Sequence, residues 1–327
     1  MHLFSEKEIR EVVGLNEKAL SLIEEGFERL AEGAVSQPQV ARVDLADKNG
    51  EVDIKTAYIR GLETFAIKIS SGFFDNEKYG LPSLGGMMML LSTETGVPQA
   101  LMHDNGYLTD VRTGIAGALA AKYMAPASVN TCGVIGTGAQ ARFQVEALRL
   151  ARGFDRVLVY GRTPEKVETY KKEMEEKLDV PVEAASSPEE VVKESEVVIT
   201  TTPSKEAIIK KEWLHPKLHI TAMGSDAEHK QELDPNIFQA ADIVACDVYS
   251  QAVEMGELHH AKQAQMIKDP KQILEMGPLV KGEVSGRTSD QQITVCDLTG
   301  TGVQDTAISV YAYQTLKANG KGQEYQS

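Results

Sequence analysis

The sequence has few of the features that mark disulfide-rich or zinc-binding proteins. Only three cysteines occur in 327 residues, and they are far apart, at Cys132, Cys246 and Cys296. Because none belongs to a Cys-x-x-Cys pair, neither a disulfide framework nor a zinc site is predicted. Each cysteine lies in an apolar run, which favours a buried position in a strand.

Positive charge and long apolar runs are also lacking. The formal net charge is −14, so no surplus of basic residues is available to neutralise nucleic-acid phosphates. No apolar run approaches the ~20 residues that span a bilayer, and the first residues lack a basic and apolar leader pattern. We therefore expect a cytoplasmic protein that binds neither nucleic acid nor a membrane.

The strongest motif that is present is a glycine-rich turn well inside the chain. An apolar strand over 132–135 leads into Gly136-x-Gly138-x-x-Ala141, and a helical pattern follows. Glycine at 136 permits a tight turn, glycine at 138 lets backbone amides approach a pyrophosphate, and the small residue at 141 allows close packing of the helix on the strand. This order predicts an NAD(P)(H) site, to which we also assign Ala139 and Gln140.

The end of the next strand, over 156–160, bears on the choice of cofactor. The residues Tyr160-Gly161-Arg162-Thr163 include no Asp or Glu that could accept a hydrogen bond from a ribose 2′-hydroxyl. Arg162 and Thr163 would suit a 2′-phosphate, which favours NADP(H) over NAD(H). Alternatively, Arg162 only stacks on the adenine.

The pattern of apolar residues predicts two kinds of fold along the chain. Residues 5–32 are expected to form an amphipathic helix pair, and period-two runs between 39 and 101 predict strands. From 130 to about 300, strands alternate with helices, which is typical of a parallel doubly wound sheet. The expected strands there are 132–135, 156–160, 181–184, 197–201, 218–222, 242–246 and 292–297, and the expected helices include 140–152, 164–178 and 188–194, with a final helix after 302.

Four basic residues of the first part are candidates for a substrate site: Arg42, Lys55, Lys68 and Arg112. A lysine in a strand usually faces solvent. Lys68, however, has apolar neighbours in Phe65-Ala-Ile-Lys-Ile, and a buried lysine needs an anionic partner or a lowered pKa, both typical of active sites. Arg112 opens an Ala-rich helix, from which it could reach a carboxylate or the cofactor phosphates.

In the second part, Asp226 follows the strand over 218–222. Ligands bind at the carboxyl ends of strands in such sheets, so Asp226 is placed for proton transfer, with helix capping as the alternative. The pair His259-His260 has no neighbouring Cys or acidic ligand pattern, and we assign no metal site.

Together these features resemble the ornithine cyclodeaminase/mu-crystallin family over nearly the whole chain. The resemblance implies an α/β fold in which a Rossmann doubly wound domain, residues 121–301, is inserted into an α+β substrate-binding and dimerisation domain, residues 1–120 with 302–327. A homodimer is implied as well. The motifs that carry it are Lys68, Thr93-Glu-Thr-Gly-Val-Pro, Thr109-Asp-Val-Arg-Thr, Gly136-Thr-Gly-Ala-Gln-Ala, Met223-Gly-Ser-Asp226 and Gly302-Val-Gln-Asp.

The resemblance also implies residue roles. Lys68 and Arg112, with Arg42, would hold the substrate α-carboxylate, although Pro38-Gln-Val-Ala-Arg42 is longer than the Pro-x-Arg spacing common in the family. Lys68 and Asp226 would be catalytic, the latter by proton transfer. The cofactor site would include Ser83, which resembles the position that helps to seat the nicotinamide amide, together with Arg112, Met223 and Ser225.

One departure bears on the substrate. Cyclodeaminase members carry an acidic residue about where Lys55 stands, and a lysine there would repel the distal ammonium of ornithine and attract a second carboxylate, unless it points to solvent. The segments 50–58 and 71–76 resemble the subgroup of iminosuccinate reductases and ectoine-utilisation cyclodeaminase-like proteins. We therefore expect hydride transfer from NAD(P)H to a small 2-imino dicarboxylate, with iminosuccinate giving aspartate. The alternatives are cyclodeamination of ornithine, lysine or diaminobutyrate with NAD, alanine dehydrogenation, or a non-catalytic NADPH-binding protein.

Overall fold

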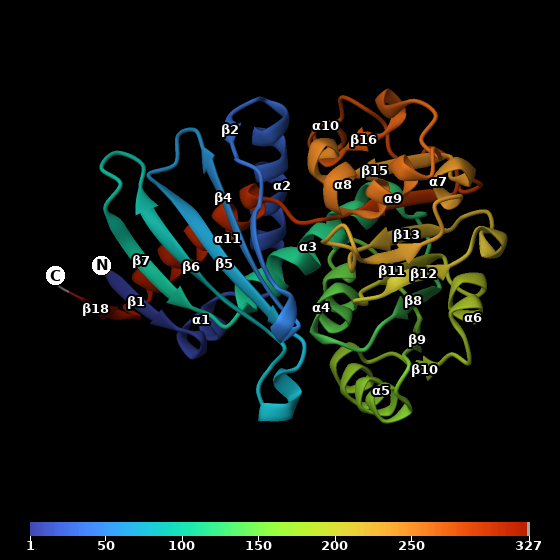
Figure 1. The fold of residues 1–327 in the computed structure, drawn as a ribbon, viewed down its shortest axis with the longest axis horizontal. Helices are drawn as coiled ribbons and strands as arrows, with labels where there is room; N and C mark the ends of the chain where they lie inside the picture. Colours follow the sequence, from blue (N-terminus) through green and yellow to red (C-terminus); the bar gives the residue numbers. More distant parts are fainter. Residues whose placement is uncertain (326–327) are drawn as a thin grey trace. The chain divides into compact units, whose positions relative to one another are not determined.

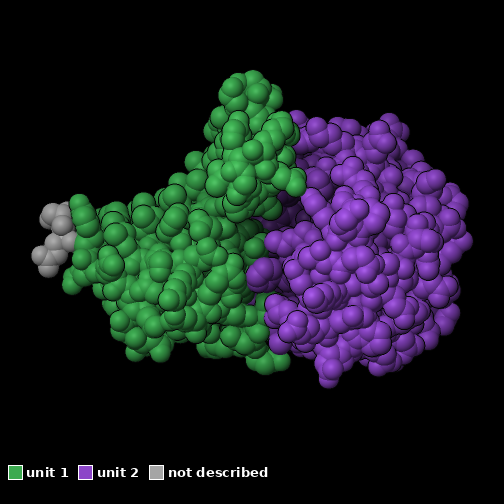
Figure 2. All heavy atoms as spheres, turned by 90° about the horizontal axis from the view of Figure 1, so that it is seen from below, with its two compact units in different colours: residues 1–112, 301–327 green, residues 113–300 purple. Residues whose placement is uncertain are grey.

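The chain folds into two compact units, which Figure 2 shows in green and purple. The computed structural model describes residues 1–325. One unit consists of Met1–Arg112 with Thr301–Ser327, and the other of Thr113–Gly300. The first border falls at residue 112, inside helix α3 (Tyr107–Met124), whereas the sequence had placed it at 120. A continuous helix therefore carries the chain from the first unit into the second.

The first unit is built on one mixed sheet with the strand order β18-β1-β7-β6-β5-β4-β2, and β3 also pairs with β4. The pairs from β3 to β7 are antiparallel, whereas β1 runs parallel to β7. The sequence did not predict β1, because four residues are too few to display a period. The strands are β1 (His2–Ser5), β2 (Val35–Ser36), β3 (Ala41–Leu45), β4 (Gly50–Ile59), β5 (Thr64–Phe73), β6 (Leu84–Ser92), β7 (Pro98–His103) and β18 (Gln323–Glu324).

Helix α11 (Gly302–Ala318) runs along one face of this sheet (Figure 1). Alternate residues of β4 are buried on that face, as expected for a half-covered strand. The helix begins so close to β4 that a Cβ at Gly302 would lie 2.4 Å from the Thr56 carbonyl oxygen, so only glycine fits there. The predicted helix pair is confirmed as α1 (Glu6–Val12) and α2 (Glu17–Ala31).

The second unit has the predicted parallel sheet, with the strand order β10-β9-β8-β11-β13-β17-β15-β16. The order reverses between β8 and β11, which makes their carboxyl ends the switch point where dinucleotides bind in such folds. The strands are β8 (Thr131–Ile135), β9 (Arg156–Tyr160), β10 (Val182–Ala184), β11 (Val197–Thr200), β13 (His219–Ala222), β15 (Ile243–Cys246), β16 (Leu274–Glu275) and β17 (Thr294–Asp297).

Most predicted elements of this unit are confirmed, with corrections at their ends. Helices α5 (Pro164–Leu178) and α6 (Pro188–Lys193) match, but α4 (Ala139–Leu148) ends four residues before the predicted position 152. All three cysteines are buried free thiols, on β8, β15 and β17. The sequence did not predict several short elements, namely α7 (Ile237–Ala240), α8 (Tyr249–Met255), α9 (Glu257–Gln263), α10 (Met276–Val280), β12 (Lys205–Ile209), β14 (Gln231–Leu233) and β16.

Candidate active site

A buried charged cluster lies in the first unit around Asp305 of α11. The Lys68 Nζ on β5 lies 3.1 Å from Asp305 Oδ2, and the Arg112 Nε on α3 lies 2.8 Å from Asp305 Oδ1. Lys55 of β4 stands directly opposite Lys68 in the sheet. The exposed fractions are 2% for Lys68, 4% for Arg112, 6% for Lys55 and 0% for Asp305. The alternative that Lys55 points to solvent is therefore wrong.

Burial and neighbouring charges change the protonation of this cluster. Burial, together with the nearby charges of Arg112 and Lys55, lowers the pKa of Lys68 from its ordinary value of 10.5 to about 7, against the opposing effect of Asp305. Burial would raise the pKa of Asp305, but Arg112, Lys68 and Lys55 outweigh it and lower that pKa. Near neutral pH, the Lys68 amine therefore exists in both protonation states, a property typical of active-site lysines.

Asp305 and Gln304 are members of the cluster to which the sequence gave no role. The Arg112 Nη1 donates to Gln304 Oε1 at 2.9 Å, so Gln304 holds the guanidinium in addition to Asp305. Gln304 Nε2 is buried and makes no hydrogen bond within the described residues. Such a donor is costly to bury unless a ligand accepts from it. The signal in the sequence was the motif Gly302-Val-Gln-Asp at the start of an otherwise apolar helix.

Arg42 does not join this cluster, although the sequence assigned it to the substrate. Its Nε donates to Asp44 at 2.9 Å, its Nη2 donates to Glu51, and its Nη1 lies 3.5 Å from Asp53. The register of β3 on β4 places Arg42 directly opposite Asp53, so the pairing follows from the sheet itself. With three carboxylates around it, the guanidinium is already occupied, and the predicted role in binding the substrate carboxylate is not supported.

The glycine turn of the second unit has the geometry that a pyrophosphate requires. Gly136 has φ of 121°, and a Cβ there would lie 2.5 Å from the Thr201 Oγ1, so the turn needs glycine. Gly138 is the N-cap of α4, has no side-chain cap, and has open space where a Cβ would stand. The start of α4, at Ala139, therefore has the form of an anion-binding helix N-terminus. These residues fit a bound dinucleotide.

The end of β9 presents the two residues that were predicted to choose the cofactor. Arg162 and Thr163 are both exposed. Thr163 is the N-cap of α5, yet its hydroxyl makes no capping hydrogen bond, and Pro164 occupies the first helical position. This end of the strand therefore offers a guanidinium and a hydroxyl without a competing carboxylate in residues 160–163. Ser83, the remaining predicted cofactor residue of the first unit, lies in the loop before β6, and its role stays a prediction.

The loop after β13 holds Asp226, and a buried lysine is paired with it. The Lys230 Nζ lies 2.6 Å from Asp226 Oδ1. Ser225 is buried, and its hydroxyl donates to the Lys230 carbonyl oxygen at 2.6 Å. The Ser225 hydroxyl therefore closes the loop, and the predicted cofactor-binding role of Ser225 stays a prediction. Met223, also predicted for the cofactor, lies at the start of the same loop, and its role remains a prediction.

A buried carboxylate that the sequence did not single out, Glu232, joins the segments that follow β11 and β13. Glu232 accepts hydrogen bonds from the Thr200 hydroxyl at 2.6 Å, the Gly224 amide at 2.8 Å and the Thr202 amide. Burial raises the pKa of Glu232, although these donors oppose the shift. The residue fixes the ends of β11 and β13 relative to each other, and with them the loop that carries Asp226.

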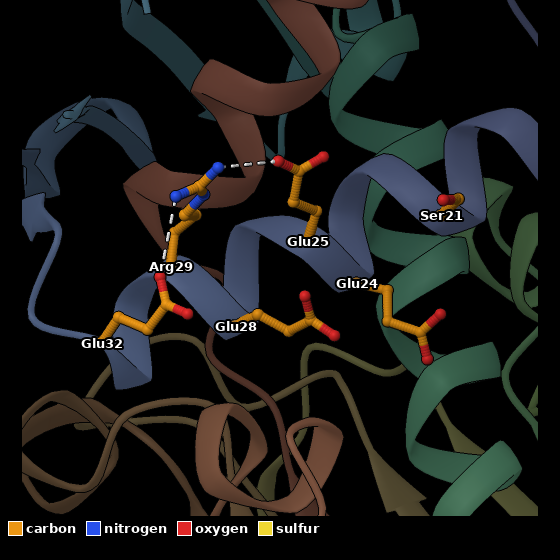
Figure 3. Close-up of a pocket in the computed structure, with 6 residues that line it drawn as sticks. All are labelled: Ser21, Glu24, Glu25, Glu28, Arg29 and Glu32. Atoms are coloured by element: carbon orange, nitrogen blue, oxygen red, sulfur yellow. Dashed lines mark hydrogen bonds and ion pairs between the residues drawn. The ribbon is translucent and has the colours of Figure 1, made fainter. Parts of the chain in front are cut away.

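A surface pocket of about 380 Å³ is lined by residues of α2 (Figure 3). Its lining carries four glutamates and Arg29, which pairs with Glu25 at 3.4 Å and Glu32 at 3.7 Å. An acidic lining does not suit an anionic substrate or a dinucleotide. Within residues 1–325, no group of three or more His, Cys, Asp or Glu is arranged to hold a metal, and no helix is long and apolar enough to cross a membrane.

The parallel sheet, its glycine turn and the uncapped start of α4 define a Rossmann-type enzyme that uses a nicotinamide dinucleotide. The chain belongs to the ornithine cyclodeaminase/mu-crystallin family, whose model matches residues 2–320. The predicted family, fold class and enzyme class are thereby confirmed.

Two rhizobial proteins are similar along their whole length. A candidate dehydrogenase of Rhizobium meliloti is 45% identical over 100% of this chain and 99% of its own. An uncharacterised cyclodeaminase of Sinorhizobium fredii is 44% identical with the same coverage. The relatives share the family and differ in the reaction that their names give.

Solved structures of the family share the fold of the whole chain. The Delta(1)-pyrroline-2-carboxylate reductase of Thermococcus litoralis, in complex with NADH and L-proline, has a TM-score of 0.94 at 26% identity, covering 99% of this chain and 100% of that one. An archaeal alanine dehydrogenase dimer with bound NAD has a TM-score of 0.92 at 30% identity, covering 100% and 99%. The iminosuccinate reductase of Paracoccus denitrificans, in complex with NAD+, has a TM-score of 0.90 at 30% identity, again covering 100% and 99%.

Proposed function

We propose that this protein reduces a small 2-imino dicarboxylate with NAD(P)H, and that iminosuccinate, which gives aspartate, is its substrate. The observation that carries the proposal is the buried cluster in which Lys68 and Arg112 share the single carboxylate of Asp305. When Lys68 is protonated, this trio has a net positive charge in a desolvated place, and an anion is needed to balance it. Lys55, opposite Lys68, adds to the positive potential.

The residue roles follow from this charge distribution. Lys68 and Arg112 bind the α-carboxylate, and the buried Gln304 Nε2 supplies a further donor. Lys55 binds the distal carboxylate. A bound nicotinamide dinucleotide would supply the hydride for the carbon of the protonated imine. The ionised Asp226 carboxylate keeps the imine nitrogen protonated, and after reduction it passes a proton from solvent to the neutral amine, so that the product leaves as an ammonium ion.

The same cationic strand disfavours ornithine-type cyclodeamination. A diamine substrate would bring its distal ammonium toward the ammonium of Lys55. Two like charges in a buried site raise the free energy of binding by several kcal/mol, as they do when they face each other in a protein interface. The proposal would be overturned if the enzyme catalysed cyclodeamination or alanine dehydrogenation in preference to reduction of the dicarboxylate imine.

An absorbance assay at the nicotinamide band tests the function directly. The enzyme is mixed with NADH or NADPH, ammonia and a panel of 2-oxo acids that includes oxaloacetate, pyruvate and Delta(1)-pyrroline-2-carboxylate as the preformed imine. We expect the fastest oxidation with oxaloacetate and ammonia. Equal or faster turnover of the monocarboxylates would contradict the dicarboxylate assignment, and no oxidation with any of them, together with release of ammonia from ornithine, would favour cyclodeamination.

For the cofactor, we propose a preference for NADP(H). Arg162 and the uncapped Thr163 hydroxyl support it, because both suit the 2′-phosphate, and residues 160–163 carry no carboxylate to bind a 2′-hydroxyl. The two dinucleotides in the same assay give the preference as a ratio of kcat/KM. A ratio that favours NADH would mean that Arg162 stacks on adenine or faces solvent.

Substitution of Lys55 by glutamate should change the substrate preference. We expect kcat/KM for the dicarboxylate imine to fall by about 10²-fold or more, because a buried attraction of ~2–5 kcal/mol is replaced by repulsion. Turnover of a monocarboxylate imine should fall much less. The control is Lys48→Glu, on an exposed lysine of the same hairpin, which should change neither value. Equal losses for both substrates would show that Lys55 does not contact the distal carboxylate.

We also propose a homodimer. The face of the sheet opposite α11 carries apolar side chains that are exposed in the single chain, and Ile54 and Ile69 pair directly across β4 and β5. Val43 and Tyr58 extend this patch. Contiguous exposed apolar surface is typical of interaction sites. Analytical ultracentrifugation should give a dimer, and Ile54→Asp should weaken it; a monomer at micromolar concentration would contradict the proposal.

A further inference from the structure

Four contacts in or next to the loop after β13 involve Lys230. Its Nζ lies 2.6 Å from Asp226 Oδ1, and its amide donates to the Ala227 carbonyl at 3.0 Å. Its own carbonyl oxygen accepts from the Ser225 hydroxyl at 2.6 Å and from the His260 Nε2 at 2.8 Å. The lysine is thus fixed at its main chain and at its ammonium.

The two partners of the ion pair differ in their exposure. The Lys230 side chain is 8% exposed, whereas that of Asp226 is 42% exposed. An ammonium that is buried to this extent pays a desolvation cost, which a surface salt bridge does not. Lys230 thus holds the Asp226 carboxylate from its buried side, while the Asp226 side chain is partly exposed to solvent. A group that exchanges a proton with a ligand needs such access.

We propose that Lys230 is a positioning residue for the reaction: it keeps the Asp226 carboxylate ionised and fixes its orientation for proton exchange with the substrate nitrogen. The proposal rests on the proposed function, in which Asp226 exchanges that proton. Lys230 itself touches neither substrate nor cofactor in this scheme. Its effect is electrostatic, because an ammonium within hydrogen-bond distance stabilises a carboxylate relative to its neutral acid.

Other titratable groups surround the pair and must be separated from Lys230. Glu228 and His229 lie on the same loop. Glu232 of β14 accepts from the Gly224 amide, two residues before Asp226, and Glu257 of α9 accepts from the Glu232 amide. His260 of α9 contacts the Lys230 carbonyl rather than its ammonium. Substitution of His260 therefore disturbs the loop without removing the positive charge next to Asp226, which makes it the matched control.

The test is the pH profile of kcat/KM in the direction of amino-acid oxidation, in which Asp226 must be ionised to accept the proton from the amino nitrogen. In Lys230→Met, the midpoint of the acidic limb should move to higher pH by about one unit or more, because the Asp226 carboxylate loses the neighbouring ammonium that stabilises its ionised form. Lys230→Arg should restore the limb to within a few tenths of a unit. Dinucleotide affinity, followed by quenching of protein fluorescence, should stay within about twofold in every variant, since the glycine turn is unchanged.

The controls separate the two proposals. Asp226→Asn should remove the acidic limb altogether; if the limb persists, Asp226 is not the proton-exchanging group and the proposed function is wrong at this residue. If Asp226→Asn removes the limb but Lys230→Met leaves its midpoint unchanged, only the role of Lys230 is wrong. A shift of equal size in His260→Gln would mean that loop geometry, and not the ammonium, sets the profile, and would also overturn the proposal.

Discussion

Lys68→Met is expected to lower imine reduction by roughly 10³-fold, the scale on which loss of one buried charged or hydrogen-bonding group that contacts a reacting substrate is measured. The methionine keeps most of the volume of the lysine in a position that is 2% exposed, so the sheet should stay packed. Binding of NAD(P)H should persist, because the dinucleotide contacts are assigned to the glycine turn of the other unit. Steady-state kinetics and a fluorescence titration with the dinucleotide measure the two effects.

The same lysine should set the pH dependence. Its pKa is lowered to about 7, so the protonated form that binds a carboxylate is lost as the pH rises through that value. For the free enzyme, kcat/KM of an anionic substrate should therefore fall above pH ~7, and bound substrate should shift the limb to higher pH by favouring the charged amine. Lys68→Arg should abolish this limb, because a guanidinium stays protonated. Lys78→Met, on an exposed lysine, serves as the control. Full activity of Lys68→Met would overturn the assigned site.

Asp305→Asn is expected to destabilise the first unit strongly. The carboxylate is the shared partner of Lys68 and Arg112 and is completely buried, and removal of one member of a buried charge cluster costs about 3–5 kcal/mol. In this variant Lys68 can lose its proton, which removes one of the two unpaired charges. The loss of free energy of unfolding should therefore lie near the lower end of this range. Chemical denaturation followed by circular dichroism measures the change in the free energy of unfolding.

A double variant makes this expectation specific. The double variant Lys68→Met, Asp305→Asn should lose less free energy of unfolding than the two single variants lose together. The reason is that the Lys68 cation, which Asp305→Asn alone would leave unpaired, is removed as well. Asp75→Asn removes an exposed aspartate paired with Lys78 and should cost less than about 1 kcal/mol. Strict additivity in the double variant would mean that the two residues do not interact as the structure places them.

The candidate site residues that the sequence singled out, and that the structure places as expected, share a local signal. Lys68 has apolar neighbours on one strand, and Gly136 and Gly138 lie within a single strand-turn-helix unit, so their environment depends on adjacent residues. Asp305 could not be found in this way, because it pairs with residues nearly 200 and more than 230 positions earlier in the chain. Neither could the burial of Lys230, whose carbonyl oxygen contacts His260, 30 residues later in the chain.

The surroundings of Arg42 could not be predicted for the same physical reason. A basic residue in a strand can face a substrate or a neighbouring strand, and the choice depends on register, which one strand does not specify. Pairing of β3 with β4 places Asp53 opposite Arg42 and brings Glu51 within reach, so the guanidinium is used inside the sheet. The acidic residues at 51 and 53 were visible in the sequence, but their distance from Arg42 was not.

The position of Asp305 has a consequence for the order in which this enzyme becomes competent. Lys55, Lys68 and Arg112 are synthesised within the first 112 residues of the chain, whereas the buried carboxylate near them follows the entire Rossmann unit, on α11. A nascent chain thus holds its cations without a counter-ion while nearly 200 further residues are added. The nucleotide-binding unit can fold on its own contacts during that time. The anion-binding cluster is completed only when α11 packs on the sheet. A chain whose synthesis stops before α11 therefore lacks the Asp305 carboxylate and has an incomplete cluster.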